Sequence, residues 1–191
     1  MITSPGTECK LKIGKQDDPH TVVTAMYFEL QKELNYNIGV TTERKNKCPV
    51  CKKEDKGTED NESCLAVCFD NGDNIQEILE NQMNTEFYCT TCNKDVRSEM
   101  IKKITVHSES IMIFHSQIYG QRARKITISK EITLNGKTYT LRAIVYHSPG
   151  HYYTVGIRKN QWYELNDSRA SKIQSMNEEL PKMLCYTLKD N

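Results

Sequence analysis

The sequence predicts an α+β protein of two lobes, in which antiparallel β-strands predominate and helices are few. In the second half of the chain, segments rich in β-branched and aromatic residues follow one another between Gly, Asn, Ser and Pro residues, as in an antiparallel sheet. In the first half, two Cys-x-x-Cys pairs in polar surroundings predict a small metal-binding lobe. Since the sequence has 26 basic and 25 acidic side chains, its charges nearly balance, and we do not expect a protein that coats nucleic acid.

Neither a membrane span nor a signal peptide is indicated. The longest strictly apolar run, residues 111–114, is far shorter than the roughly 20 residues that a transmembrane helix needs. Residues 1–6 have neither a basic nor an apolar region of the kind that starts a signal peptide. We therefore expect a cytoplasmic or nuclear protein, in which cysteines bind metal more often than they form disulfides.

Two helices are predicted in the first half. Apolar residues recur at a helical spacing over residues 17–34, with Asp17 or Asp18 as N-cap and Pro19 in the first turn, where proline is tolerated. A second helix is expected over residues 74–83, with its isoleucines and Leu79 facing inward.

Between these helices, residues 41–62 are polar and lysine-rich, and we expect a metal-binding loop with a flexible tip there. A short strand is expected over residues 63–69. After the second Cys pair, strands are predicted over residues 100–106, 111–119, 125–129, 139–146, 152–158, 161–165 and 183–188. Asn135-Gly136 predicts a hairpin turn between residues 132–134 and 138–140.

The four paired cysteines predict a structural zinc site. Two tight turns can each present two thiolates, and together they complete the four-coordinate shell that Zn²⁺ prefers; the ligands are Cys48, Cys51, Cys89 and Cys92. A redox role for one pair, or thiols without metal, is the alternative. Cys64, Cys68 and Cys185 stand in apolar, strand-like segments, where we expect them to pack as small hydrophobic residues.

A histidine and an asparagine are predicted to meet across a hairpin. If Lys159-Asn160 is a two-residue turn, Asn166 opposes Tyr153 and lies diagonal to His151 on the same sheet face. Asn166 would then orient the imidazole and leave its other nitrogen free to take a proton from a thiol. Asp167 would point to the opposite face, and a three-residue loop would reverse the two assignments.

These residues resemble the histidine box of the ubiquitin-specific proteases, the ubiquitin carboxyl-terminal hydrolases with a papain-like cysteine protease fold. The similarity rests on Gly150-His151-Tyr152, on Trp162 and on Asn166-Asp167-Ser168. It extends, in the family's own order, to residues 15–18 with the helix after them, the two Cys pairs, the strand at 111–114 and the strand around Cys185.

The resemblance implies a division of labour along the chain. Residues 1–40 would be a residual thumb and palm helix segment, residues 41–99 zinc-binding fingers that hold ubiquitin or a ubiquitin-like protein, and residues 100–191 the palm. His151 would be the general base, with Asn166 as its partner and Asp167 as an assistant. Gly150 would let a substrate backbone pass closely, and Tyr152 would line the cleft.

The match breaks at the nucleophile. The family carries it in a block resembling Gly-Asn-Thr-Cys-Tyr, well before the segment that Gln16 begins, and this chain has no such block. Cys9 is the only cysteine before Gln16, and it echoes that block only through its spacing from Gly6. Lysines follow it where an apolar helix would begin, and Ser4 stands where the oxyanion-hole asparagine is expected.

Three functional hypotheses remain from the sequence. The first is a deubiquitinase, either a fragment whose thumb is missing or a shortened enzyme with an unusual nucleophile. A split protein that a thumb-bearing partner chain completes is a variant of this hypothesis. The second is a catalytically inactive ubiquitin-binding scaffold with the same fingers and palm. The third, a zinc-ribbon module for nucleic acid, accounts for the cysteines but leaves the histidine hairpin unexplained.

Overall fold

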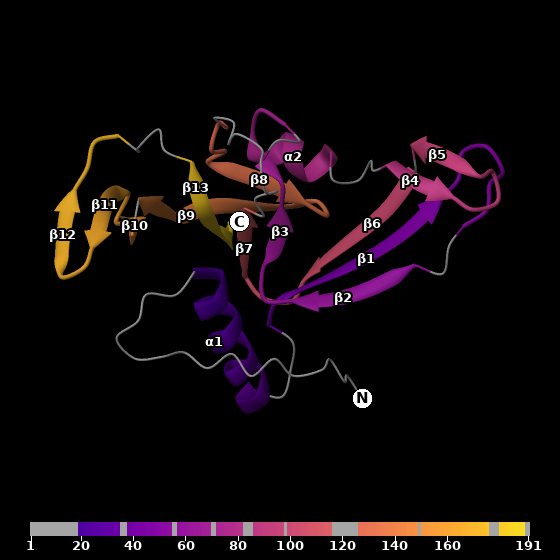
Figure 1. Ribbon diagram of the computed structural model, residues 1–191. Helices are drawn as coiled ribbons and strands as arrows, with labels where there is room; N and C mark the ends of the chain where they lie inside the picture. The colour runs from indigo at the N-terminus through magenta and orange to yellow at the C-terminus, as the bar shows by residue number, and fades with distance from the viewer. Residues whose placement is uncertain are drawn as a thin grey trace.

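The predicted α+β class is confirmed by the computed structural model (Figure 1). The structure describes residues 19–34, 38–54, 57–69, 72–81, 86–97, 99–115, 126–148, 150–175 and 180–189. In these ranges the chain forms two α-helices, α1 (Pro19–Leu34) and α2 (Ile75–Asn81), and three β-sheets. Neither of these helices has the length and apolar character that crossing a bilayer requires.

The largest sheet has eight strands. Seven of them are neighbours in the order β12-β11-β10-β9-β13-β7-β3, and the eighth, β8, pairs with β9. All pairs are antiparallel except β3 with β7. The strands are β3 (Leu65–Val67), β7 (Ser110–His115), β8 (Glu131–Leu134), β9 (Lys137–Ser148), β10 (His151–Arg158), β11 (Gln161–Asn166), β12 (Arg169–Lys172) and β13 (Pro181–Leu188).

One face of this sheet forms the hydrophobic core with α2. Alternate residues of the central strands are fully buried there, including Ile113, Ile144 and Leu184. The α2 residues that the sequence places inward, Ile75, Ile78 and Leu79, are buried against them, which confirms that prediction. Burial of each such side chain contributes about 1.5–3 kcal/mol, so this face holds the sheet together.

The helix α1 lies on the other side of the sheet, below it in Figure 1. The His20 ring lies 4.5 Å from that of Phe114, a β7 residue between two buried neighbours, and the Thr24 and Ser63 hydroxyls are 2.9 Å apart. Tyr27 is buried beside Gly39, where an added Cβ would come within 2.6 Å of the Tyr27 ring. These contacts confirm the helix over residues 19–34, while the predicted N-cap residues lie outside the described ranges.

A long three-stranded sheet projects from this body. It has the order β2-β1-β6, with β1 (Val40–Lys47), β2 (Thr58–Glu62) and β6 (Glu99–Val106). Figure 1 shows β1 and β6 running out to the two-stranded hairpin of β4 (Glu86–Cys89) and β5 (Lys94–Arg97) at the far end. We call the turn at 48–54 together with this hairpin the tip.

The polar segment after residue 40 is a strand pair, so the loop predicted for residues 41–62 is wrong over most of its length. β1 pairs with both β2 and β6 through backbone hydrogen bonds, which polar residues make as well as apolar ones. Because β6 pairs with β1, the strand predicted at 100–106 belongs to the projecting sheet. The boundaries proposed for the three parts of the chain stay a prediction.

Most strands of the second half are as predicted, with one exception. Residues 126–129 are not a strand: Thr127 makes a single bridge to Asn74, and its backbone N–H donates to the Asp73 carbonyl. This stretch therefore closes over the start of α2 and pairs with no strand. The hairpin at Asn135-Gly136 is confirmed, since Leu134 pairs with Lys137 and both turn residues have a positive φ.

Candidate active site and metal centre

The hairpin of β10 and β11 has the predicted register. Lys159 and Asn160 have φ angles of 50° and 59°, the left-handed pair of a two-residue type I′ turn. Arg158 therefore pairs with Gln161, and Thr154 with Leu165. The two strands carry His151 and Asn166 at the end opposite to this turn.

His151 and Asn166 are brought together as the register predicts. The His151 Nε2 atom lies 2.6 Å from the Asn166 Oδ1 atom, and both side chains are half-buried. An amide oxygen can only accept a hydrogen bond, so this contact places the imidazole hydrogen on Nε2. The Nδ1 atom then carries the lone pair, which is the form that can take a proton from a thiol.

Gly150 has a reason of its own to be glycine. It precedes His151 in the turn between β9 and β10, which the pairing of Ser148 with His151 closes, and it has a φ of +76°. A side chain is rarely found in that conformation, although no atom would crowd an added Cβ there. The close passage of a substrate backbone stays a prediction for this residue.

Tyr152 is on the opposite face of β10 from His151, because neighbouring strand residues alternate. Its ring stacks on His147 of β9, with ring centroids 4.4 Å apart. Tyr153, on the His151 face, stacks on Tyr146 within the core. The role of Tyr152 in a substrate cleft stays a prediction.

Asp167 is not part of a strand, so the strand alternation from which its orientation was predicted does not apply to it. β11 ends at Asn166, which pairs with Arg169, so Asp167 lies in the intervening turn with a φ of 51°. This turn borders a concavity of about 460 Å³. Its lining consists of Glu164, Asn166, Asp167, Ser168, Arg169 and Ser171.

One residue of this group escaped the sequence analysis. The Asn166 Nδ2 group donates to the Glu164 Oε1 atom at 3.4 Å. Glu164 stands two positions before Asn166, and that spacing places two strand residues on one face. The two-residue spacing of Glu164 and Asn166 is therefore the sequence signal for this hydrogen bond, once Asn166 is taken as the partner of His151.

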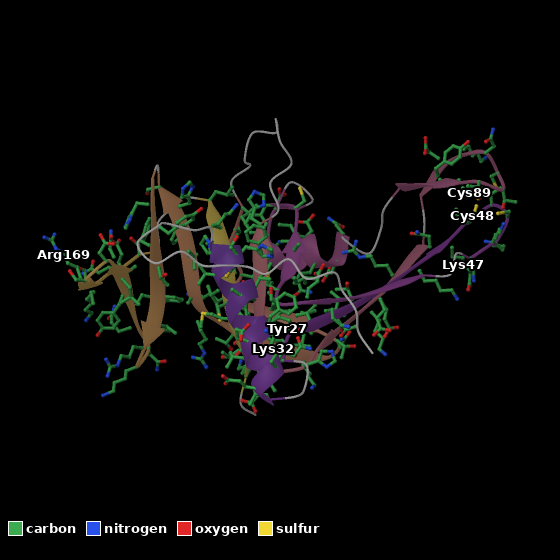
Figure 2. All side chains as sticks on the ribbon, turned by 60° about the horizontal axis from the view of Figure 1, so that its bottom comes forward. Tyr27, Lys32, Lys47, Cys48, Cys89 and Arg169 are labelled. Atoms are coloured by element: carbon green, nitrogen blue, oxygen red, sulfur yellow. The ribbon has the colours of Figure 1, made fainter. Side chains whose placement is uncertain are left out.

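At the other end of the molecule, the four paired cysteines converge. Their sulfur atoms all lie within 4.8 Å of one another, with 3.7 Å between Cys48 and Cys92 and 3.7 Å between Cys51 and Cys89. Four thiolates about 2.3 Å from a tetrahedral Zn²⁺ would be separated by roughly 3.8 Å. The cluster therefore has the dimensions to hold a metal ion. Figure 2 shows Cys48 and Cys89 at one end of the molecule and Arg169 at the other.

Each Cys-x-x-Cys pair is followed by one residue with left-handed backbone. Lys52 has a φ of 61° and Asn93 a φ of 52°. In the first pair, the Lys52 N–H donates to the Cys48 carbonyl at 2.9 Å, and the Cys48 N–H donates to the Lys53 carbonyl at 2.9 Å. These bonds close a tight turn that points both thiols toward the second pair.

The sulfur atoms differ in their electrostatic surroundings. The backbone N–H of Cys51 donates toward the Cys48 sulfur and lowers the pKa of that thiol to about 6. Hydrogen bonding to Cys51, together with burial, raises the pKa of Cys92 to about 12. Val96 is the buried apolar neighbour of this cluster. A divalent cation that replaces the shared protons is the natural occupant of such a group.

Among the described cysteines outside the cluster, Cys185 lies well away from His151. Cys64 is buried, and burial raises the pKa of the Cys185 thiol, in keeping with the packing roles predicted for them. Cys185 pairs with Ala143, which precedes Ser148 by five residues on β9, or roughly 17 Å. That distance excludes Cys185 as the thiol served by His151. Cys9 lies outside the described residues.

A comparison with protein families agrees with this geometry. The family model described as ubiquitin carboxyl-terminal hydrolase matches residues 3–186. The chain belongs to the ubiquitin carboxyl-terminal hydrolase family. The resemblance of its histidine hairpin and cysteine pairs is thereby confirmed at the level of the family.

Solved structures share the fold. The chain is similar to the SAGA DUB module of Ubp8, Sgf11, Sus1 and Sgf73 bound to monoubiquitin, with a TM-score of 0.61 and 19% identity over 81% of this chain and 41% of that chain. The structure of the Ubp8-Sgf11-Sgf73-Sus1 SAGA DUB module gives a TM-score of 0.61 and 21% identity, over 81% of this chain and 40% of that chain.

A yeast SAGA DUB module with an altered Sgf73 gives a TM-score of 0.58 and 20% identity, over 85% of this chain and 45% of that chain. At these identities the similarity supports the fold alone. This member of the hydrolase family spans less than half the length of the chains it resembles. No curated protein matches it.

Proposed function

We propose that this chain provides the base and fingers portion of a deubiquitinase, a thiol-dependent protease that hydrolyses the bond after the C-terminal glycine of ubiquitin. The contact between His151 Nε2 and Asn166 Oδ1, in a chain of the hydrolase family, is the observation that carries the proposal. His151 Nδ1 would take the proton of a cysteine thiol, and the thiolate would attack the carbonyl. The same imidazolium would then protonate the leaving amine, and water would hydrolyse the thioester.

The thiol in this scheme comes from outside the described residues. The candidate sources are Cys9, a cysteine on a thumb-bearing partner chain, and a cysteine on a thumb segment of a longer chain of which this sequence is a part. Apolar side chains exposed on α1 support a partner, since Met26 is 56% exposed, Leu30 42% and Leu34 47%. These three residues follow one another at intervals of four, which places them along one side of the helix.

The activity is tested by release of a fluorophore from a ubiquitin C-terminal conjugate, with and without a candidate partner chain. We expect His151→Ala to abolish turnover and Asn166→Ala to lower it by about 10²-fold or more, because the base loses its orientation. His107→Ala is the matched control, since His107 makes an equally short contact with the Thr41 hydroxyl in the projecting sheet. Turnover that survives His151→Ala would contradict the proposal.

The reactive cysteine can be named directly. After exposure to ubiquitin carrying a C-terminal electrophile, mass spectrometry of the peptides should show an adduct on Cys9 or on the partner's thiol. An adduct on a cysteine of the metal cluster would instead indicate nonspecific alkylation.

A second candidate is a catalytically inactive module that binds ubiquitin or a ubiquitin-like protein. It is favoured by the position of the described cysteines, which lie in the tip or in the packed sheet and not beside His151. A binder should retain affinity for ubiquitin in a titration while releasing no fluorophore under any partner condition. His151→Ala would then leave the affinity unchanged.

We further propose that the four cysteines hold one structural Zn²⁺. Support comes from the spacing of the sulfur atoms and from the all-thiolate donor set, which suits zinc. Since all four positions are protein ligands, the ion would stabilise the tip without taking part in catalysis. A reducing compartment, cytoplasm or nucleus, would keep these thiols available for metal.

A further inference from the structure

We propose that Glu164 is a positioning residue that fixes where the hydrogen of the His151 imidazole resides. The inference rests on the proposed role of His151 as a base, and it adds a residue to that site. Glu164, Asn166 and His151 form a chain of two hydrogen bonds, 3.4 Å from Asn166 Nδ2 to Glu164 Oε1 and 2.6 Å from Asn166 Oδ1 to His151 Nε2.

The strands place these three side chains on one face. Glu164 and Asn166 are separated by one residue on β11, and β10 brings His151 alongside through the register in which Val155 pairs with Glu164. All three side chains are half-buried, so the two bonds are shielded in part from competing water. Half-burial makes a charged acceptor stronger than it would be at a fully exposed site.

An asparagine amide can face the imidazole with either its oxygen or its nitrogen. A carboxylate only accepts hydrogen bonds, so Glu164 holds the NH₂ group of Asn166 and turns the oxygen toward His151. That oxygen in turn only accepts, which requires the hydrogen on Nε2 and leaves the lone pair on Nδ1. With the amide reversed, the hydrogen would move to Nδ1, and the imidazole could no longer take a proton from a thiol at that atom.

Three substitutions separate charge, shape and polarity at this position. In Glu164→Gln the shape is retained, but the side-chain amide can present either its oxygen or its nitrogen to Asn166, so both orientations of the Asn166 amide become open. In Glu164→Ala no acceptor remains, and both amide orientations become open. In Glu164→Lys the ammonium group only donates, so it binds the Asn166 oxygen and reverses the amide. Glu131→Gln is the control. Glu131 lies on β8 of the same sheet, and its carboxylate pairs with Lys189.

The first measurement does not depend on activity. In ¹⁵N NMR spectra of the full chain with its metal bound, we expect the His151 signals of the native protein and Glu131→Gln to show hydrogen on Nε2. In Glu164→Lys we expect hydrogen on Nδ1, and in Glu164→Gln and Glu164→Ala a mixture. The backbone amide spectrum checks that each variant is folded. An unchanged His151 tautomer in both Glu164→Ala and Glu164→Lys overturns the proposal.

The second measurement is the rate of adduct formation with the ubiquitin electrophile. We expect a loss of roughly three- to tenfold in Glu164→Ala and Glu164→Gln, a larger loss in Glu164→Lys, and a rate within about twofold of native in Glu131→Gln. If Glu164→Gln keeps the native rate, an acceptor-only group at this position is not the cause and the proposal fails. If the native protein forms no adduct under any condition, the proposed activity fails, while the NMR result still decides the role of Glu164.

Discussion

The tip and the large sheet of this molecule are stabilised in different ways. Among the tip side chains that the structure describes, the buried ones are Cys48, Cys89 and Val96. In the large sheet, a continuous cluster from six strands and α2 is buried, with Ile144, Tyr146 and Tyr186 fully inaccessible. The large sheet is therefore held together by apolar burial, whereas the tip brings together four thiols that could hold a metal ion.

The difference follows from what each region can remove from water. A fully buried apolar side chain contributes about 1.5–3 kcal/mol, and the large sheet buries many of them. The tip offers exposed side chains such as Val50, at 58%, and Tyr88, at 52%. Burial alone therefore leaves the tip marginal, and metal binding would supply the missing stability.

Removal of metal is the largest effect we expect. Structural zinc sites bind with apparent free energies of about 10–16 kcal/mol, and this energy would be lost locally on chelation or in Cys89→Ser. Hydrogen exchange over residues 48–54 and 86–97 should then lose protection, while strands β9, β10 and β13 keep theirs. One zinc ion per chain should be found by elemental analysis.

Cys185→Ser is the control for this experiment, because Cys185 lies in β13 and outside the cluster. It should leave the metal content at one ion per chain. A single cooperative loss of all structure on chelation would show that the two regions are not independently stabilised. That result would contradict the distinction between the tip and the large sheet.

A cavity in the core should have the converse effect. Ile144 is fully buried between Val155 of β10 and Leu184 of β13, so Ile144→Ala should lower the free energy of unfolding by about 2–5 kcal/mol. Denaturant titration of the zinc-loaded protein measures this loss, and the metal content should not change. Leu165→Ala, at a side chain 48% exposed, should stay within about 0.5 kcal/mol of native.

Alkaline pH should weaken the sheet through its buried tyrosines. Burial raises the pKa of Tyr186 well above its ordinary value of 10.0, and its hydroxyl donates to the Ser129 carbonyl at 2.8 Å. The folded protein keeps this group neutral, so its contribution is complete below pH 10 and is lost as the pH rises, because the unfolded chain ionises first. The loss reaches at most about 1.4 kcal/mol per pH unit for this group.

Thermal unfolding between pH 8 and pH 11 measures this dependence. Burial also raises the pKa of Tyr27 and Tyr139, so Tyr186→Phe should flatten the alkaline decline in part and not abolish it. Tyr88→Phe, at the exposed tip, should leave the slope as it is. An identical slope in both variants would contradict the assignment to Tyr186.

The smallest effect on stability is expected at α1. Because Leu30 is 42% exposed, Leu30→Glu should change the free energy of unfolding by no more than about 0.5 kcal/mol. The same change should strongly weaken complementation by a thumb-bearing partner, if that partner covers the apolar side of the helix. Lys32→Gln, at an exposed side chain of the same helix that pairs with Glu29, is the control. Complementation that is insensitive to Leu30→Glu would place the partner elsewhere.

The sequence predicts best where a turn sets the pairing of its two flanking strands. The strands that flank Asn135-Gly136 and those that flank Lys159-Asn160 pair in the expected register, because a two-residue turn allows only one register. The contact between His151 and Asn166 follows from that register alone. The sequence predicts worst at strands with no apolar pattern, such as β12, whose four residues are all exposed.

Other features depended on the three-dimensional arrangement. The turn that ends β11 takes Asp167 off the strand, and the carboxylate that holds Asn166 proved to be Glu164. The stretch at 126–129 has the composition of a strand, yet its backbone pairs with the segment before α2. In each case a local pattern was consistent with more than one partner.

By itself, then, the sequence determined the cysteine ligand set, the two hairpin registers and the histidine's partner, because turns and short spacings act over a few residues. Only the tertiary structure decided that β13 lies between β9 and β7, that β3 runs parallel to β7, and that β1 and β6 carry the two cysteine pairs to one place. Long-range strand pairing is made by backbone N–H and C=O groups, which every residue but proline offers alike. The side-chain pattern therefore does not record which strand will be the neighbour.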